Sequence, residues 1–343
     1  MATIDMHSHI VPRGLSDALR ARETMPFIRR DEKGEYLSSM MRTNALLKPG
    51  FDSIEERLAD MDRNGVDRAV LSNQLQDISA LPLADAEALC RACNDSLSAA
   101  CVAHPDRFHA LAALPMGSVE AATREFERAI ALPGIIGAIV PGDAFLTAKR
   151  AARWAPLLEA ADRAGAIILA HYGRLPDDPA APKPDLDDNR HLRQGTLDMQ
   201  ARNSSAMLTF CLTDFLTKYP NLTMMSHNLG GNIPFEVERM DHRVLVDQPP
   251  GTELPSKRIR AARVLVDCNS LGARSIELGV SVYGADKIVF GSDGTHFGMD
   301  WTNKAIAEAR ISDAEKAAIL GGNAANAIAR ATARHAVAAR AAE

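Results

Sequence analysis

Residues 135–142 read IIGAIVPG, residues 152–165 read ARWAPLLEAADRAG, and residues 166–171 read AIILAH. The first and third runs are short, apolar and rich in β-branched side chains, whereas the middle run has the spacing of an amphipathic helix and stops at a glycine. Near-continuous apolar strands joined by a helix are typical of a parallel sheet that is buried on both faces. The stretch therefore predicts a strand–helix–strand unit.

The same alternation repeats about eight times along the chain. Helical stretches separate the expected strands, which lie at residues 2–6, 67–72, 108–115, 135–142, 166–171, 222–227, 263–268 and 287–293. Eight strand–helix units fit a (β/α)8 TIM barrel, and we expect one α/β domain over residues 1–343. A doubly wound open sheet is the alternative, because periodicity does not determine strand order.

Three connections are longer than the 2–6 residues usual between a strand and its helix, at residues 9–51, 173–195 and about 243–260. Long loops at one end of a barrel commonly form the walls of a site, so we expect them to build a lid. Residues 10–51 are interpreted as an inserted flap after the first strand. The alanine-rich residues 323–343 predict a C-terminal helical extension on the surface.

Composition and charge exclude several classes of protein. The 343 residues are 46% apolar and 24% charged, and 39 basic against 44 acidic side chains give a net charge of −5. This balance argues against a nucleic-acid partner bound through its phosphates. We find neither an apolar run long enough to span a membrane nor a signal peptide. Five irregularly spaced cysteines do not form a disulfide framework, so we expect a cytoplasmic protein.

Polar side chains stand where four of the expected strands end. His7 and His9 follow the first strand, His171 ends the fifth, His227 ends the sixth, and Asp293 ends the eighth. The carboxyl ends of barrel strands meet at one rim, where active sites of this fold are built. Residues two apart in an extended segment point the same way, so His7 and His9 face inward together.

Several imidazoles and one carboxylate that meet at one point are typical of a divalent transition-metal site. Each motif alone has an ordinary structural explanation, since an H-x-H or a single histidine after a strand is common in loops. Their joint placement after strands one, five, six and eight favours the metal site over that explanation.

The motifs IDMHSHI, ILAHYG, MMSHNLGGNIPFEVERMDHR and VFGSDGTHF together resemble the amidohydrolase superfamily. They are most similar to the branch named for aminocarboxymuconate semialdehyde decarboxylase, which also contains hydroxybenzoate and carboxyvanillate decarboxylases and some hydrolases. The resemblance extends from residue 3 to about residue 327 in motif order. It implies a TIM barrel enzyme that acts on a small-molecule substrate.

The resemblance also implies one divalent metal ion, usually Zn²⁺ and sometimes Mn²⁺. On that basis His7, His9, His171 and Asp293 are the metal ligands, and His227 is a general base or proton carrier. The fourth expected strand, IIGAIVPG, has no lysine that could be carbamylated to bridge two metals, which favours a single ion.

The branch implies nonoxidative decarboxylation of an aromatic or unsaturated carboxylic acid. In this hypothesis metal-bound water, assisted by the catalytic residues His227 and Asp293, supplies the proton that replaces carbon dioxide. The alternative is hydrolysis of a lactone, amide or cyclic imide by the same metal-bound hydroxide. A third interpretation, a barrel that only binds a ligand, fits less well because all five motif positions are intact.

Five further residues are candidates for contacts with the substrate. Arg239 matches the arginine that completes the neighbouring subunit's site in the type enzyme of the branch, which implies a homodimer. Asn73, Tyr172 and Asn269 follow strands two, five and seven, and His296 lies three residues after Asp293. Each of these residues could instead have a purely structural role or be exposed to solvent. Their assignment as substrate contacts therefore depends more on the resemblance than the assignment of the metal ligands does.

Overall fold

Eight parallel strands form the central sheet in the computed structural model of this protein. The structure describes residues 2–39, 44–48, 50–73, 78–79, 81–178, 188–189, 192–294 and 298–342, with side chains as far as residue 333. In the order of their pairing, the strands are β1 (Ile4–His9), β5 (Arg68–Ser72), β6 (Phe108–Ala112), β7 (Ile135–Pro141), β8 (Ile167–His171), β9 (Thr223–Ser226), β10 (Val264–Asp267) and β11 (Ile288–Val289). The predicted alternation of strands and helices is confirmed.

The last strand returns to the first, so that the sheet forms a barrel. The backbone N–H of Met6 donates to Phe290 O over 2.9 Å, and the N–H groups of Ser292 and Asp293 donate to His7 O over 3.2 and 2.9 Å. These bonds join the segment that follows β11 to β1. The (β/α)8 barrel is therefore the observed fold, and the doubly wound open sheet is excluded.

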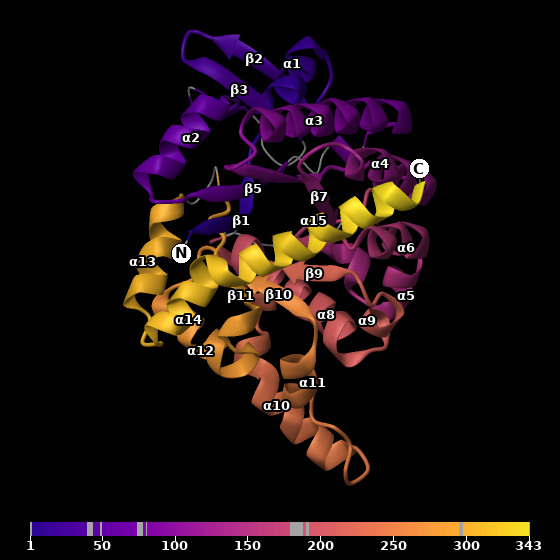
Figure 1. The fold of residues 1–343 in the computed structure, drawn as a ribbon, viewed down its shortest axis with the longest axis vertical. Coiled ribbons are helices and arrows are strands. Elements are labelled where there is room, and N and C mark those ends of the chain that lie inside the picture. Colours follow the sequence, from indigo (N-terminus) through magenta and orange to yellow (C-terminus); the bar gives the residue numbers. More distant parts are fainter. Residues whose placement is uncertain are drawn as a thin grey trace.

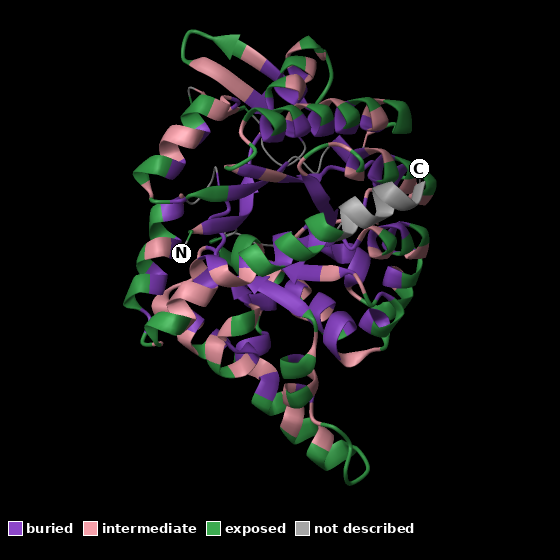
Figure 2. Cartoon of the chain, in the orientation of Figure 1, coloured by how far each residue is buried: buried purple, intermediate pink, exposed green. Residues whose placement is uncertain are grey.

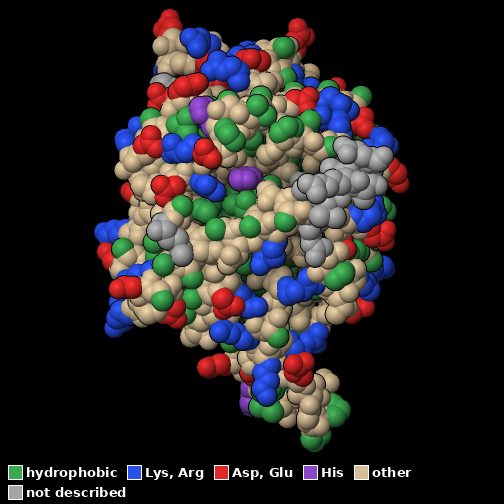
Figure 3. Space-filling view, viewed as in Figure 1, with side chains coloured by type: hydrophobic (Ala, Val, Ile, Leu, Met, Phe, Trp, Pro, Cys, Tyr) green, Lys and Arg blue, Asp and Glu red, His purple; other side chains and the backbone are tan. Residues whose placement is uncertain are grey.

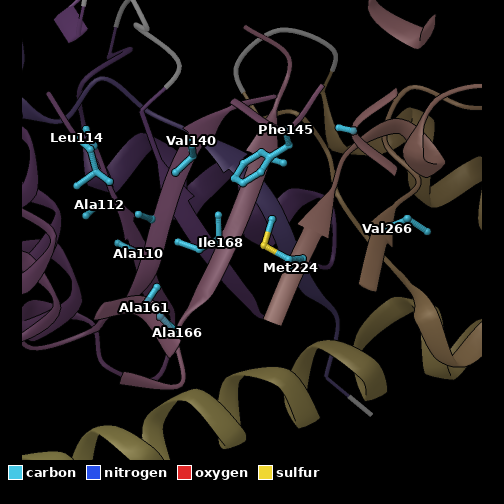
Figure 4. Close-up of a cluster of buried hydrophobic side chains, with 14 of the residues drawn as sticks. Ala110, Ala112, Leu114, Val140, Phe145, Ala161, Ala166, Ile168, Met224 and Val266 are labelled. Atoms are coloured by element: carbon cyan, nitrogen blue, oxygen red, sulfur yellow. The ribbon is translucent and has the colours of Figure 1, made fainter. Parts of the chain in front are cut away.

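Both faces of the strands are buried, which explains their nearly continuous apolar sequences. In β8, Ile167 and Leu169 point into the barrel, whereas Ile168 belongs to the core between the sheet and the helices. Met224 and Met225 of β9 divide in the same way. Figure 4 shows Ile168 and Met224 in the outer core, and Figure 2 shows the buried strands enclosed by helices with exposed outer faces.

Helices surround the barrel (Figure 1). They are α2 (Ile54–Arg63), α3 (Leu83–Ala103), α4 (Val119–Ile130), α5 (Ala148–Ala152), α6 (Ala155–Ala164), α8 (Met199–Leu212), α9 (Phe215–Lys218), α10 (Ile233–Asp247), α11 (Pro255–Ala261), α12 (Ala273–Tyr283), α13 (Met299–Glu308), α14 (Asp313–Ala317) and α15 (Asn323–Ala342), with short turns η2 (Gly142–Phe145), η3 (Arg193–Asp198), η4 (Asn228–Gly230), η5 (Ala285–Lys287) and η6 (Ala318–Gly322). Among the described helices, none has both the length and the apolar character that crossing a bilayer requires.

One of the three expected long loops was predicted wrongly. Residues 243–260 hold the end of α10, a turn and most of α11, and they precede β10 rather than follow a strand. Helix α10 continues through its charged sequence to Asp247, and Pro249 and Pro250 follow the C-cap residue Gln248. Since proline interrupts helical hydrogen bonding, the pair explains where this helix stops.

The segment after β1 has secondary structure of its own. It holds α1 (Arg13–Ala21) and an antiparallel sheet of β2 (Phe27–Asp31), β3 (Gly34–Ser38) and β4 (Ala45–Leu46). Arg20 of α1 donates from Nε to Glu35 over 2.8 Å and from Nη2 to Asp52 over 2.9 Å. The guanidinium group thus ties the helix, the small sheet and the approach to α2 together.

Helix α15 covers the amino ends of the barrel strands, rather than lying free on the surface as predicted. Ala324, Ala327, Ile328 and Ala331 are buried and share a cluster with the inward-facing side chains of the barrel. Their spacing places them on one face of the helix, and alanine is small enough to let that face approach closely. In Figure 1 the helix crosses the barrel, and in Figure 4 it runs beneath the amino ends of the strands.

Basic and acidic side chains are interspersed on this side of the molecule (Figure 3).

Candidate metal centre

Four side chains from distant parts of the chain meet at the carboxyl ends of the strands. One potential ligand atom each from His7, His9, His171 and Asp293 lies within 4.8 Å of the other three, and all four residues are buried. His9 Nε2 is 2.9 Å from His7 Nε2, 3.1 Å from His171 Nε2 and 3.2 Å from Asp293 Oδ1. The predicted convergence of these residues is therefore observed.

The local backbone explains how these side chains reach one point. His7 and His9 lie in β1, and His171 is the last residue of β8. Asp293 has a left-handed backbone with φ of 56°, and Gly294 follows with φ of 40°. A Cβ atom on Gly294 would lie 2.5 Å from the backbone nitrogen of His9, so glycine is needed for this close approach. A left-handed aspartate is uncommon, and such strain is typical of functional sites.

The arrangement of these nitrogen and oxygen atoms is better explained by metal coordination than by hydrogen bonds among the four side chains. Neutral imidazoles cannot all donate to one another, yet three Nε2 atoms face a common point at separations near 3 Å. Asp293 Oδ1 is buried and has no hydrogen-bond partner among the described residues. In a tetrahedron with Zn–N bonds of about 2.0–2.1 Å, ligand atoms are roughly 3.3 Å apart. The three distances from His9 Nε2, 2.9–3.2 Å, are slightly shorter than this value, and the 3.8 Å between His7 Nε2 and Asp293 Oδ1 is longer.

The second nitrogen of each imidazole is held by a hydrogen bond. Nδ1 of His7 pairs with Asp267 Oδ2 at 2.8 Å, and Nδ1 of His9 pairs with Ser72 Oγ at 2.8 Å. Nδ1 of His171 pairs with the carbonyl oxygen of Tyr172 at 3.0 Å. Such partners fix the orientation of the ring and leave Nε2 available as a ligand.

Burial and charge set the protonation of the cluster. Burial lowers the pKa of His9 and places that of His171 well below its usual value. Burial acts in the same direction on His7, but the Asp267 carboxylate outweighs it and raises the pKa of His7 to about 9. Against the effect of burial, the close contact with His9 Nε2 and the charges of the neighbouring imidazoles hold the pKa of Asp293 far below its usual range. Ionised carboxylates and neutral imidazoles are the forms that bind metals, so Asp293, His9 and His171 are already in that form, whereas His7 would give up a proton when an ion binds.

Asp267 is a functional residue that the sequence analysis missed. It ends β10 and is completely buried, and its Oδ1 accepts hydrogen bonds from the backbone N–H groups of Asn228 and Asn269 and from the Asn269 side chain. The charge of His7 and its hydrogen bond outweigh the effect of burial, so that the pKa of Asp267 is lowered. Its position at the end of the run RVLVDC was the available signal, since the other site residues also end strands.

Replacing Asp267 with alanine is expected to weaken Zn²⁺ binding about 10- to 100-fold, the usual cost of losing a hydrogen-bonded partner of a metal-binding histidine. The reason is that His7 Nδ1 loses the carboxylate that orients the ring. Competition with a chelator of known affinity measures the change. The matched control is Asp286→Ala, because Asp286 is 70% exposed and lies in η5, away from the four ligand atoms. Equal affinity in the two variants would contradict this role for Asp267.

Asp5 and Arg57 hold the backbone that carries the cluster, and they too were missed. Asp5 is completely buried and accepts from the backbone N–H and the hydroxyl of Ser292 over 3.1 and 2.5 Å. Arg57 of α2 donates from Nη2 to His9 O over 2.5 Å. These bonds connect β1 with the turn that presents Asp293. No motif signalled either contact, because the first depends on barrel closure and the second on how α2 packs against β1.

His227 lies beside the four ligand atoms but does not belong to their group. Its ring stacks on that of His171, with centroids 4.6 Å apart and an interplanar angle of 24°. Its Nε2 accepts a hydrogen bond of 2.9 Å from the backbone N–H of Tyr172. Burial lowers the pKa of His227 to about 4.

The other predicted site residues occupy different surroundings. Asn269 is buried, and its Nδ2 lies 3.1 Å from His7 Nδ1, so it contacts the cluster directly. Tyr172 adjoins the cluster through its backbone, and Asn73 is buried just after β5. Arg239 lies on the exposed surface of α10 and is not part of the group. His296 lies outside the described residues.

A closed (β/α)8 barrel with imidazoles and a carboxylate at its carboxyl rim defines a metal-site barrel of the amidohydrolase type. The amidohydrolase family profile matches residues 4–328. The chain belongs to the amidohydrolase family, and the resemblance found in its motifs is confirmed.

The relatives to which this chain is similar include decarboxylases. It is 26% identical to gamma-resorcylate decarboxylase of Polaromonas sp. (strain JS666 / ATCC BAA-500) over 292 residues, which cover 80% of this chain and 87% of that protein. It is 34% identical to 2-amino-3-carboxymuconate-6-semialdehyde decarboxylase of Caenorhabditis elegans over 132 residues, 37% of this chain and 33% of that one. A dihydroxybenzoic acid decarboxylase from Polaromonas sp. JS666, solved with bound manganese and the inhibitor 2-nitroresorcinol, shares the fold with a TM-score of 0.69 and 20% identity, covering 96% of this chain and 97% of that one.

Proposed function

We propose that this protein is a metal-dependent enzyme that removes carbon dioxide from an aromatic or unsaturated carboxylic acid without oxidation. The observation that carries the proposal is the convergence of three imidazole Nε2 atoms and one carboxylate oxygen at the barrel rim. The similarity to gamma-resorcylate decarboxylase over 80% of the chain supports decarboxylation rather than another reaction of the family.

In this proposal His7, His9 and His171 hold the ion through Nε2, and Asp293 holds it through Oδ1. An ion held by these residues would supply Lewis-acid chemistry. Decarboxylation breaks the bond between the ring carbon and the carboxylate, and a proton takes the place of carbon dioxide on that carbon. Asp293 and His227 are ionisable side chains at the ligand cluster, one of which would handle the proton while the other stabilises developing charge.

We propose Zn²⁺ as the ion. Three imidazoles and one carboxylate at near-tetrahedral spacing support this choice, because zinc accepts nitrogen and oxygen ligands in that geometry. Mn²⁺, which the dihydroxybenzoic acid decarboxylase binds, is the competing ion. Elemental analysis of the purified protein, followed by reloading of the metal-free chain with each ion, decides between them through the activity recovered.

The reaction is tested by following carbon dioxide release and hydrolysis in parallel. The substrate panel contains 2,6-dihydroxybenzoate and 5-carboxyvanillate on one side, and an uncarboxylated lactone and a cyclic imide on the other. We expect carbon dioxide release from a carboxylated ring and no turnover of the lactone or imide. Turnover of the uncarboxylated compounds alone would replace decarboxylation with the hydrolase alternative.

We also propose that the enzyme is a homodimer assembled through α10. Phe235, Arg239, His242 and Val246 follow one another at helical spacing along this helix and are exposed, Phe235 by 78% and Val246 by 67%. Two large apolar side chains beside an arginine fit a second copy of the chain, to whose site Arg239 would bring a carboxylate-binding guanidinium group.

Introducing a charge at this surface is expected to separate the dimer. Phe235→Asp should convert the protein to monomers, because it places a carboxylate where the apolar contact would form. Light scattering coupled to gel filtration measures the mass of the assembly. The control is Leu83→Asp, at an exposed leucine that begins α3 rather than α10. Dimers that persist in Phe235→Asp, or wild-type monomers, would overturn the assignment of α10.

We place the enzyme in the cytoplasm. All five cysteines are free and buried, which suits a compartment that keeps thiols reduced. Fractionation of cells that make the protein, with marker enzymes for each compartment, tests this location.

A further inference from the structure

A single hydrogen bond determines which nitrogen of the His227 ring carries the proton. The backbone N–H of Tyr172 donates to Nε2 of His227 over 2.9 Å. A backbone amide can only donate through its N–H, so Nε2 must present its lone pair. In a neutral imidazole one nitrogen accepts and the other carries hydrogen, and the proton of His227 is therefore on Nδ1.

The N–H group at Nδ1 of His227 lacks an acceptor in the part of the chain that the structure describes. It is buried and has no hydrogen-bond partner among the residues that the structure describes. Leaving a buried N–H unpaired is costly, and such a group in a native structure calls for an explanation, of which a catalytic role is one. The ring stacks on His171 and its centroid lies 5.6 Å from that of His7, so the ring borders the metal centre.

We propose that His227 acts as a neutral hydrogen-bond donor through Nδ1 to an oxygen atom of the bound carboxylic acid. This replaces the general-base role expected from the sequence, because Nε2, the lone pair that a base would use, already accepts from Tyr172. The inference rests on the proposed function for the identity of the ligand oxygen. The proton that replaces carbon dioxide then comes from a group other than this ring.

Two substitutions separate the two ring nitrogens. In His227→Asn the amide nitrogen takes the place of Nδ1 and keeps the donor, whereas nothing reaches the position of Nε2. In His227→Gln the longer amide reaches the position of Nε2, where its oxygen can accept from Tyr172, but no donor remains at Nδ1. The two variants therefore carry the same amide group, but one places it at the position of Nδ1 and the other at the position of Nε2.

We expect His227→Asn to keep kcat within about 10-fold of the wild type for release of carbon dioxide from 2,6-dihydroxybenzoate. His227→Gln should lower kcat about 100- to 1000-fold, the usual cost of removing one preorganised donor to developing charge. Both variants should retain the metal, since His227 is not among the four ligands. Equal losses in the two variants, or the reverse order, would overturn the inference.

Nuclear magnetic resonance of the full chain labelled with ¹⁵N-histidine tests the tautomer without any turnover. We expect a pyrrole-like nitrogen at Nδ1 and a pyridine-like nitrogen at Nε2, with the signal assigned by its loss in His227→Asn. A proton on Nε2 would refute the inference whether or not the enzyme decarboxylates. Absence of carbon dioxide release by the wild type would refute the proposed function, while the spectrum would still report the tautomer.

Discussion

His9→Ala is expected to lower kcat/KM by about 10³-fold or more and to leave the purified protein without its ion. His9 Nε2 lies within 3.2 Å of ligand atoms from His7, His171 and Asp293, so it occupies the centre of the cluster. Losing a residue that merely orients a ligand costs 10- to 100-fold, and losing the ligand itself should exceed that range. Metal content by elemental analysis and steady-state kinetics measure the two effects.

His104→Ala is the matched control for this prediction. His104 is the C-cap residue of α3, its ring centroid lies 6.0 Å from that of Phe108, and it is not among the four ligands. The control should keep both metal and activity. A His9→Ala protein that is fully active and retains one ion per chain would refute the metal centre.

Gly137→Ala is expected to lower the free energy of unfolding by more than about 3 kcal/mol. Gly137 lies in β7 opposite Ile167 of β8, and a Cβ atom at residue 137 would lie 1.8 Å from the carbonyl oxygen of Ile167. That oxygen belongs to the backbone of a central strand, which cannot move aside without breaking the barrel. Urea denaturation followed by circular dichroism measures the change.

Gly195→Ala provides the comparison for the same substitution in open space. Among the described residues, none outside the local helix backbone has an atom within 4 Å of the Cβ position at Gly195, so its effect should stay within about 1 kcal/mol. Similar stabilities of the two variants would show that β7 and β8 tolerate the added methyl group, contrary to the prediction.

The strands were predictable because burial on both faces gives them near-continuous apolar sequences. Seven of the eight expected runs contain an observed strand of the barrel, and the first, residues 2–6, overlaps β1. Their boundaries were less accurate: β1 extends to His9 rather than ending at residue 6, because hydrogen bonds to β5 continue past the apolar residues. Hydropathy does not record where pairing ends.

The histidines of the site were predictable, whereas their supports were not. His7, His171 and Asp293 each stand at or near the end of a strand, and strand ends meet at one rim of a barrel. The contact between Asp267 and His7 joins residues 260 positions apart, and it depends on the relative positions of β10 and β1 along the barrel axis. A sequence pattern carries no information on those positions. The same holds for the bond from Tyr172 to His227, which decides the tautomer.

The burial of α15 was missed for a different reason. Ala324, Ala327 and Ala331 recur at the spacing of one helical face, but alanine also supplies half of the described exposed positions of the same helix, which are Ala325, Asn326, Ala329, Arg330, Thr332 and Ala333. The contrast in composition between the two faces was therefore weak. Only Ile328 marked the side that enters the barrel, and one apolar residue is too weak a signal.

The join between the first and the last strand has a consequence for how the protein is made. His7 and His9 leave the ribosome early, whereas Asp293 and the turn that Asp5 holds through Ser292 are synthesised nearly 300 residues later. A nascent chain that lacks β11 has no complete set of ligands, so tight capture of the ion must wait until the barrel has closed. Ion binding then favours the folded chain by mass action, and cells short of metal should accumulate a less stable barrel.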